Sequence, residues 1–266
     1  MNFRVARNHL RRQKVRWRIG QKNRVTRLIG GFRPRDTILS SYPRSGNTWM
    51  RFLVANLMDG TREVSSDQLD QIVPGVFKLD RQGFEELPEP RVYKMHHPLF
   101  RDFPRFVYIV RHPLDSLWSY YHFQVGTGIY AGTAADFLRY KDVAWEWADH
   151  AQSAYAQLQT RPAEVCWVRY EDLKSNTHGE LTRVADFLNL DVTSDQIATS
   201  VERCRIDNLR KNERKHGSVE SKQGLDFFRS GEVGQGDKSF DAESIRYIRR
   251  LVGPTAAKLG YDMNRS

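Results

Sequence analysis

One short turn carries several groups suited to holding an anion. Residues 43–48 have the sequence Pro-Arg-Ser-Gly-Asn-Thr and lie between an apolar run, 37–42, that is typical of a strand and a stretch, 48–58, with helical spacing. The first backbone N–H groups of a helix have no partner within the helix, and the helix dipole is positive at that end. Together with Arg44 and two hydroxyl groups, these N–H groups predict a phosphate site.

The best-known nucleotide-binding form of such a turn is absent. The pattern Gly-x4-Gly-Lys-Ser/Thr does not occur, and no glycine in the chain is followed by lysine. That lysine and its magnesium partner are the features of kinases and ATPases that use this loop. A nucleotide kinase with a degenerate phosphate loop therefore becomes the weaker hypothesis, and we expect phosphate binding without a metal.

A lysine and a histidine stand two residues apart at the end of a second predicted strand, 91–96. Side chains at this spacing lie on the same face of a strand, so Lys94 and His96 can face one ligand. A cation and an imidazole suit group transfer to a hydroxyl. The neighbouring His97 competes for the role of base, but alternation sends it to the opposite face. A surface His-His pair is the structural alternative.

Two further segments carry basic residues beside small ones. Arg111 follows a nearly continuous apolar run, 106–110, and Ser119 lies eight residues later in a predicted helix, 114–123. The planar guanidinium is a good phosphate ligand, although an ion pair between Arg111 and Asp115 explains the same residues equally well. Farther on, Arg229 precedes Gly231 in a polar, glycine-containing stretch.

These residues are positioned by a predicted alternation of strands and helices. A fourth strand is expected at 165–170, and further helices are expected at 181–188, 194–204 and 242–261. Strands separated by helices favour an α/β fold with a parallel sheet, which binds ligands at the carboxyl ends of its strands. Residues 209–236 contain few apolar side chains and predict a long loop or lid.

The net charge of +10 comes from the first 35 residues, which hold twelve of the 42 basic side chains and no acidic one. Residues 36–266 therefore have 30 basic and 32 acidic side chains. We expect a basic extension, 1–35, followed by one domain, 36–266. An extension of this kind contacts an anionic membrane surface, nucleic acid or an acidic partner, or it is a transit peptide, or it is a solvated or self-packed segment.

The location expected from sequence is the cytoplasm, with peripheral membrane contact through the extension left open. Cys166 and Cys204 lack the spacing of metal ligands and suit a reducing compartment. The chain has no apolar run of membrane-spanning length and no secretory signal.

Five motifs in order resemble the nucleotide-dependent sulfotransferases. These enzymes move a sulfuryl group from 3′-phosphoadenosine 5′-phosphosulfate (PAPS) to an acceptor hydroxyl or amine and release 3′-phosphoadenosine 5′-phosphate (PAP). The turn is similar to the family's TYPKSGTTW loop, and the other segments are similar to its KTHLP, RNPKDxxxSYYHF, YEDL and RKGxVG motifs. The matching segments here are SYPRSGNTW, KMHHP, RHPLDSLWSYYHF, RYEDL and FRSGEVG.

The resemblance implies a P-loop-like three-layer fold, with a central parallel sheet flanked by helices, and a set of site residues. His96 would be the general base, with Lys94 and Arg44 neutralising charge at the transferring group. The residues expected to hold the nucleotide are Arg44, Ser45, Gly46, Asn47, Thr48, Trp49, Arg111, Ser119, Tyr170, Thr199, Arg229 and Gly231. No metal is implied. The loop lysine is replaced by Arg44, and the second basic residue of the late motif is replaced by Ser230.

The acceptor stays open between a small phenol or alcohol, a carbohydrate and a lipid. Segments 61–90 and 124–150 are expected to line its pocket, although their aromatic residues suit a helix core equally well. Besides the kinase, a non-catalytic nucleotide or nucleic-acid binding protein is the alternative hypothesis. The near-neutral domain gives no reason to expect nucleic acid, since the basic charge lies in the extension.

Overall fold

A computed structural model describes residues 32–78, 80–98, 100–218, 227–228 and 231–263. Most of the predicted basic extension and Arg229 lie outside these residues, so the predictions for them stay predictions. The described part contains a sheet of four parallel strands in the order β2-β1-β3-β4. The strands are β1 (Thr37–Ser41), β2 (Val92–Met95), β3 (Arg105–Val110) and β4 (Val165–Arg169). The predicted parallel α/β fold is confirmed.

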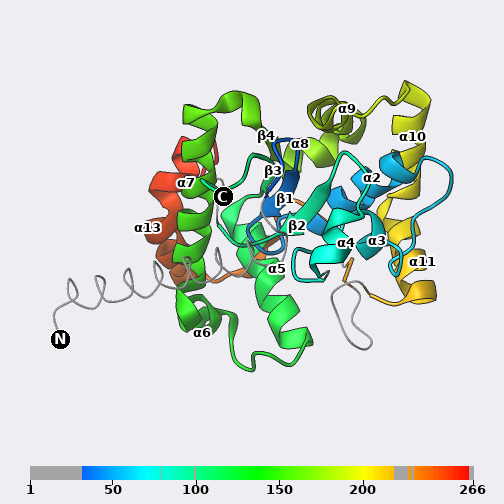
Figure 1. Cartoon of the computed structure of the whole chain (residues 1–266). Helices are drawn as coiled ribbons and strands as arrows, with labels where there is room; N and C mark the ends of the chain where they lie inside the picture. The colour runs from blue at the N-terminus through cyan, green and yellow to red at the C-terminus, as the bar shows by residue number, and fades with distance from the viewer. Residues whose placement is uncertain (1–31, 79, 99, 219–226, 229–230, 264–266) are drawn as a thin grey trace.

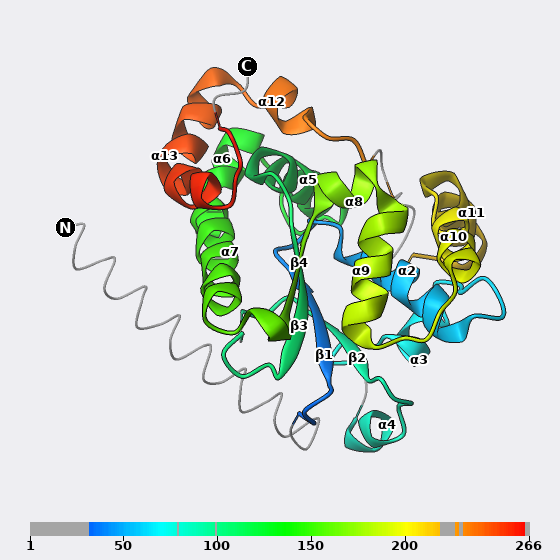
Figure 2. The same cartoon turned by 90° about the horizontal axis from the view of Figure 1, so that it is seen from above.

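Helices cover both faces of this sheet and make a three-layer structure (Figure 1). The long helices are α2 (Asn47–Asp59), α5 (Pro113–Gly126), α7 (Val143–Thr160), α9 (Thr177–Leu188), α10 (Ser194–Arg203), α11 (Ile206–His216) and α13 (Ala242–Lys258). The short ones are α3 (Leu69–Ile72), α4 (Arg81–Glu85), α6 (Ala134–Arg139), α8 (Tyr170–Ser175) and α12 (Gln235–Ser239). In Figure 2, α7 and α13 lie on one side of the sheet, and α2, α9, α10 and α11 lie on the other. None of the helices in the described ranges is long and apolar enough to cross a bilayer.

Alternation along β3 divides the core between the two faces. Phe106 and Tyr108 pack with residues of α5, α7 and α13, whereas Val107 and Ile109 pack with residues of α2, α9 and α10. All four of these side chains are fully buried. A strand that is buried on both faces reads as a continuous apolar run, which is why it was visible in the sequence.

One prediction was wrong, because the polar stretch that begins at Leu209 is not all loop. Residues up to His216 belong to α11, whose inner face is anchored largely by polar side chains. Asn212 is buried and donates to the carbonyl oxygen of Val64 at 3.0 Å, and Glu213 accepts from the N–H of Phe227 at 3.0 Å. A helix held by buried polar contacts lacks the apolar stripe that identifies helices in sequence.

A buried ion pair joins the starts of two strands. Asp36 and Arg91 are almost completely buried, and two bonds of 2.8 and 2.5 Å connect the guanidinium to the carboxylate. We expect Asp36→Ala to lower the free energy of unfolding by about 3–5 kcal/mol, because it leaves an uncompensated buried charge. Urea denaturation measures this. Glu243→Ala, which breaks the exposed pair with Arg139, is the matched control and should cost less than about 1 kcal/mol. Equal losses in the two variants would contradict the prediction.

Candidate functional site

A cavity of about 290 Å³ lies where the carboxyl ends of the strands meet. The turn after β1, His96 after β2, Arg111 after β3 and Tyr170 after β4 all contribute to its wall. Residues from α5, α8 and α11, together with Phe227, Phe228, Gly231 and Gln235, complete it. This is the edge of a parallel sheet at which ligands bind.

The turn after β1 is shaped to expose the start of α2. Arg44 and Gly46 both have positive φ, 64° and 99° respectively. The helix begins at Asn47 with no side-chain cap and no acidic residue in its first turn. Its positive end therefore faces the cavity with no acidic side chain of its own first turn beside it, which suits a bound phosphate. A non-glycine residue at positive φ is strained, and such strain collects at functional sites.

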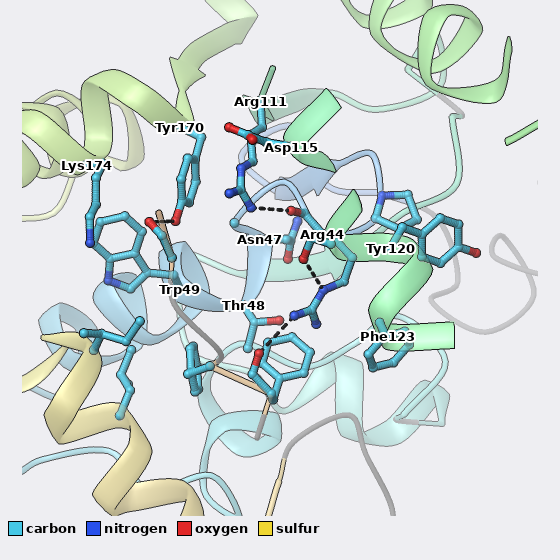
Figure 3. Close-up of a pocket in the computed structure, with 18 of the residues that line it drawn as sticks. Arg44, Asn47, Thr48, Trp49, Arg111, Asp115, Tyr120, Phe123, Tyr170 and Lys174 are labelled. Atoms are coloured by element: carbon cyan, nitrogen blue, oxygen red, sulfur yellow. Dashed lines mark hydrogen bonds between the residues drawn. The ribbon is translucent and has the colours of Figure 1, made fainter. Parts of the chain in front are cut away.

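The Arg44 side chain crosses the middle of the cavity (Figure 3). Its Nη2 donates to the carbonyl oxygen of Phe227 at 2.9 Å, and its Nε donates to Ser119 Oγ at 3.3 Å. The guanidinium carbon lies 4.0 Å from the ring centre of Phe227 and 4.9 Å from that of Phe123. A planar guanidinium stacks on aromatic rings in a way that an ammonium does not. These contacts account for arginine where the resembling family has lysine.

Arg111 is a buried cation whose partners are neutral. Its side chain is 7% exposed, and it donates to the carbonyl oxygens of Arg44 at 3.3 Å and Glu232 at 2.7 Å. The guanidinium also lies 4.2 Å from the ring centre of Tyr170. Among the described residues, its hydrogen-bond partners are carbonyl oxygens and no carboxylate, and its Nε has no hydrogen-bond partner. A buried charge without a counter-ion is costly, so this position calls for an anionic ligand.

The alternative ion pair between Arg111 and Asp115 is not formed. The Asp115 carboxylate accepts instead from the backbone N–H groups of Gly234 and Gly236, both at 2.8 Å. It thereby fixes the end of the late glycine motif, at Gly234, and the start of α12 against α5. This contradicts the structural interpretation of Arg111 and leaves its charge for the cavity.

Aromatic side chains make one end of the cavity. Trp49 donates from Nε1 to the carbonyl oxygen of Cys204 at 3.0 Å, and its ring packs edge-on against Tyr170 at 5.9 Å. The Tyr170 hydroxyl donates to the carbonyl oxygen of Gly231 at 2.9 Å. Burial raises the pKa of Tyr170, although the charge of Arg111 opposes the shift. Figure 3 shows Trp49, Tyr170 and Lys174 together at this end and Tyr120 and Phe123 at the other.

His96 lines the cavity just beyond the end of β2. Its Nδ1 lies 2.8 Å from the carbonyl oxygen of Ser41. Since a carbonyl only accepts, Nδ1 carries the proton in the neutral ring, and Nε2 is the nitrogen that can accept one. His97 packs instead against the Phe77 ring, 5.2 Å away, and is not among the residues that line the cavity.

Most of the predicted site residues meet at this cavity, but some do not. The lining includes Arg44, Gly46, Asn47, Thr48, Trp49, His96, Arg111, Ser119, Tyr170 and Gly231. Ser45 is buried behind the turn, where its hydroxyl is 3.3 Å from that of Ser116. The lining does not include Lys94, and Arg229 is outside the described residues.

Thr199 lies on the exposed side of α10 and is not among the residues that line the cavity. Its neighbour Ser200 faces inward and donates to the carbonyl oxygen of Leu53 at 2.9 Å. Successive residues of a helix point in directions about 100° apart, so Thr199 does not share the inward direction of Ser200. Cys204 and Ile206, at the junction of α10 and α11, line the cavity instead.

Several lining residues were missed in the sequence. They are Cys204, Ile206, Leu209, Tyr120, Phe123, Gln124, Lys174, Phe227 and Phe228. The expected aromatic walls from segments 61–90 and 124–150 lie elsewhere, and Phe84 and Trp147 are fully buried in the core. The pair Phe227-Phe228 was the feature of the sequence that indicated a lining role, because aromatic residues in a mostly polar stretch are expected to pack against another part of the protein.

Comparison with known proteins identifies the family. The sequence model of the sulfotransferase domain matches residues 34–260. Sulfotransferase 6B1 of Danio rerio is 27% identical over 254 residues, which cover 86% of this chain and 82% of that protein.

Solved structures share the fold. Mouse sulfotransferase SULT7A1, crystallised with PAP, superposes with a TM-score of 0.67 at 21% identity, covering 86% of this chain and 87% of that one. Retinol dehydratase in complex with androsterone and inactive cofactor PAP gives 0.63 at 20% identity, covering 85% and 81%. The chain therefore belongs to the sulfotransferase family, and it is an enzyme of sulfuryl transfer.

Proposed function

We propose that this enzyme takes its sulfuryl group from PAPS, binds PAPS in the cavity described above, and transfers the group to the hydroxyl of a small molecule. The observation that carries the proposal is the convergence of Arg44, Arg111 and the start of α2 on one cavity, with no carboxylate paired to Arg111 in the described part of the chain. A donor with two separated anionic groups satisfies these charges.

The donor would lie along the cavity in a defined direction. The backbone N–H groups at Gly46 to Thr48, with Arg44, would hold the 5′-phosphosulfate, and Ser45 would support the turn from behind. Arg111 and Ser119, joined by Arg229 and Gly231, would hold the 3′-phosphate. Trp49 and Tyr170 would contact the adenine, together with Cys204 and Ile206 in place of Thr199. PAP in the structures of related fold supports this choice of nucleotide.

Transfer would follow from the position of His96. The acceptor oxygen attacks sulfur as its proton passes to His96 Nε2, the bond between sulfur and the bridging oxygen of the 5′-phosphate breaks, and the products are the sulfate ester and PAP. Arg44 would offset the negative charge on the transferring group, a contribution that is large when the cation is already in place. Lys94, two residues before His96, is retained as a proposed second source of positive charge.

The acceptor would enter at the end of the cavity lined by Tyr120, Phe123 and Phe227. Three aromatic rings and the Gln124 amide make a mostly apolar wall, which suits a phenol or an apolar alcohol better than a carbohydrate. Retinol dehydratase, which shares the fold, was solved in complex with androsterone, an apolar alcohol. Cytoplasmic location stays a proposal, supported by two free buried thiols.

Transfer of labelled sulfate from PAPS to a panel of phenols, alcohols, sugars and amines tests the proposal. The expected result is product with phenols or alcohols, undiminished by a chelator. Transfer of phosphate from a nucleoside triphosphate, lost on chelation, would instead support the kinase hypothesis. PAP binding with no transfer to any acceptor would leave a non-catalytic binding protein.

Gly46→Ala tests the shape of the turn. A Cβ at Gly46 would lie 2.6 Å from Cδ2 of Tyr170, and φ is 99°. We expect PAP affinity, measured by calorimetry, to fall at least about 10-fold, because the turn or Tyr170 must move to make room for the Cβ. The positive φ adds about 1–2 kcal/mol of backbone strain in the variant. Gly60→Ala, at the other end of α2, is the control, since its φ is 67° but no atom lies within 3.8 Å of its Cβ. Equal losses of PAP affinity in both variants would contradict the prediction.

A further inference from the structure

A buried histidine lies directly behind His96. His150 belongs to α7 and is 5% exposed, and its Nε2 is 2.8 Å from the backbone carbonyl oxygen of His96. Its Nδ1 is 2.8 Å from the hydroxyl of Tyr108, which belongs to β3 and is fully buried. Two elements packed behind the cavity wall are thus connected to the backbone of the proposed base.

The partners fix the direction of each hydrogen bond. The His96 carbonyl only accepts, so His150 carries its proton on Nε2 and donates it there. In the neutral ring Nδ1 is then the acceptor, and the Tyr108 hydroxyl is the donor. Burial raises the pKa of Tyr108 well above its ordinary value, which keeps this hydroxyl protonated. The neutral His150 ring is therefore held in one tautomer.

The bond from His150 to His96 lies just past the end of β2, where strand pairing no longer holds the backbone. The register of β1 and β2 ends at the pair Ser40 and Met95, so His96 lies one residue past the last ladder position. The bond from His150 replaces the missing ladder bond to the His96 carbonyl. The bond between His96 Nδ1 and Ser41 then orients the ring.

The His150 ring is itself confined. It stacks on Tyr108 with ring centres 5.6 Å apart, and Phe100 and Tyr42 meet it edge-on at 5.2 and 6.1 Å. Close-packed aromatic neighbours of this kind restrict a side chain to one orientation.

We propose that His150, oriented by Tyr108, is a positioning residue that holds the His96 backbone so that Nε2 faces the acceptor. This inference rests on the proposed role of His96 as the base. Small displacements of a catalytic group lower rates steeply, so the effect should appear in kcat and not in binding of the donor.

Four variants of the full chain test it. His150→Phe removes the donor and keeps a ring, and His150→Gln restores an N–H at about the position of Nε2. Tyr108→Phe removes only the hydroxyl that orients His150. Tyr42→Phe is the control, because it also removes a buried hydroxyl bonded to α7. The Tyr42 hydroxyl donates to the carbonyl oxygen of Val143 at 3.0 Å. It is not part of the series of hydrogen bonds that joins Tyr108 and His150 to His96.

We expect His150→Phe to lower kcat by about 10- to 100-fold and Tyr108→Phe to lower it by a few-fold, with the PAP dissociation constant unchanged. His150→Gln should recover most of the loss, and Tyr42→Phe should match wild type. In ¹⁵N spectra, His96 in wild type should show protonated Nδ1 and unprotonated Nε2, and His150→Phe should show the two nitrogens averaging.

Full kcat in both His150→Phe and Tyr108→Phe would overturn the inference. The inference would also be overturned if His150→Phe and His150→Gln lost kcat, PAP affinity and melting temperature to the same extent. Such losses would indicate that His150 only stabilises the core. Should His150→Phe not fold, the comparison of Tyr108→Phe with Tyr42→Phe decides. Failure of the proposed function is distinguishable, because wild type itself would then transfer no sulfate from PAPS.

Discussion

Replacing His96 with alanine is expected to lower kcat for sulfate transfer by about 100- to 10,000-fold, the usual contribution of a general base. PAP affinity should change little, because the nucleotide contacts proposed above come from other residues. The reason for the loss is that Nε2 is the ring nitrogen able to accept the acceptor's proton once Nδ1 is bonded to Ser41. Single-turnover kinetics, with PAP binding measured by calorimetry, separates the two effects.

His97→Ala is the matched control for this variant. The adjacent histidine packs on Phe77 and is not among the residues lining the cavity, so its removal should leave kcat within about twofold. If His96→Ala kept full activity and His97→Ala were inactive, His97 and not His96 would be the base. The two residues are adjacent after β2, so a loss caused by local unfolding would appear in both variants.

The sheet and its flanking helices were predictable because their signals are local. The run 106–110 is apolar throughout because β3 is buried on both faces, and the predicted helix 48–58 matches α2 to within one residue at each end. Parallel pairing followed from strands separated by helices. It also followed that residues at the carboxyl ends of different strands would meet, as Arg44, His96, Arg111 and Tyr170 do.

Other parts depend on contacts between distant segments. Asn212 and Glu213 look like solvated residues in sequence, yet both are buried and bind loop backbone. Whether Arg111 pairs with Asp115 was undecided at a spacing of four residues. The answer depended on Gly234 and Gly236, more than a hundred residues away, whose N–H groups satisfy the carboxylate.

Thr199 is a predicted site residue that does not line the cavity. A family position was carried onto α10, but the side chains that reach the cavity follow the end of that helix, at Cys204 and Ile206. Neither residue is chemically conspicuous. Burial raises the pKa of Cys204 well above its usual value, so this thiol is a packing residue and not a nucleophile.

Replacing Arg111 with alanine is expected to weaken PAP binding by about 30- to 1,000-fold, equivalent to about 2–4 kcal/mol. The guanidinium is buried and paired only with carbonyl oxygens in the described residues, so it is available to a phosphate. Arg111→Lys should recover only part of the affinity, since an ammonium lacks the planar fork and the stacking on Tyr170. Calorimetry with PAP measures all three proteins.

Arg105→Ala is the matched control. Arg105 begins the strand that Arg111 follows, and it is likewise held by a carbonyl, that of Phe187, and by an aromatic ring 4.3 Å from its guanidinium carbon. It lies at the opposite end of β3 from the cavity, so its removal should leave PAP affinity unchanged. Similar losses of PAP affinity in both variants would indicate that β3 needs its arginines for stability alone.

Adenosine 5′-monophosphate, which lacks the 3′-phosphate, shows which part of the nucleotide Arg111 binds. Because Arg111 also donates to the carbonyl of Arg44, its removal affects the 5′ end if the turn relaxes. A direct contact with the 3′-phosphate predicts that Arg111→Ala binds the monophosphate as wild type does and no longer prefers PAP. An equal loss of affinity for both nucleotides would assign Arg111 to the support of the turn instead. The preference for PAP would then have to come from other residues, with Arg229 the first to replace.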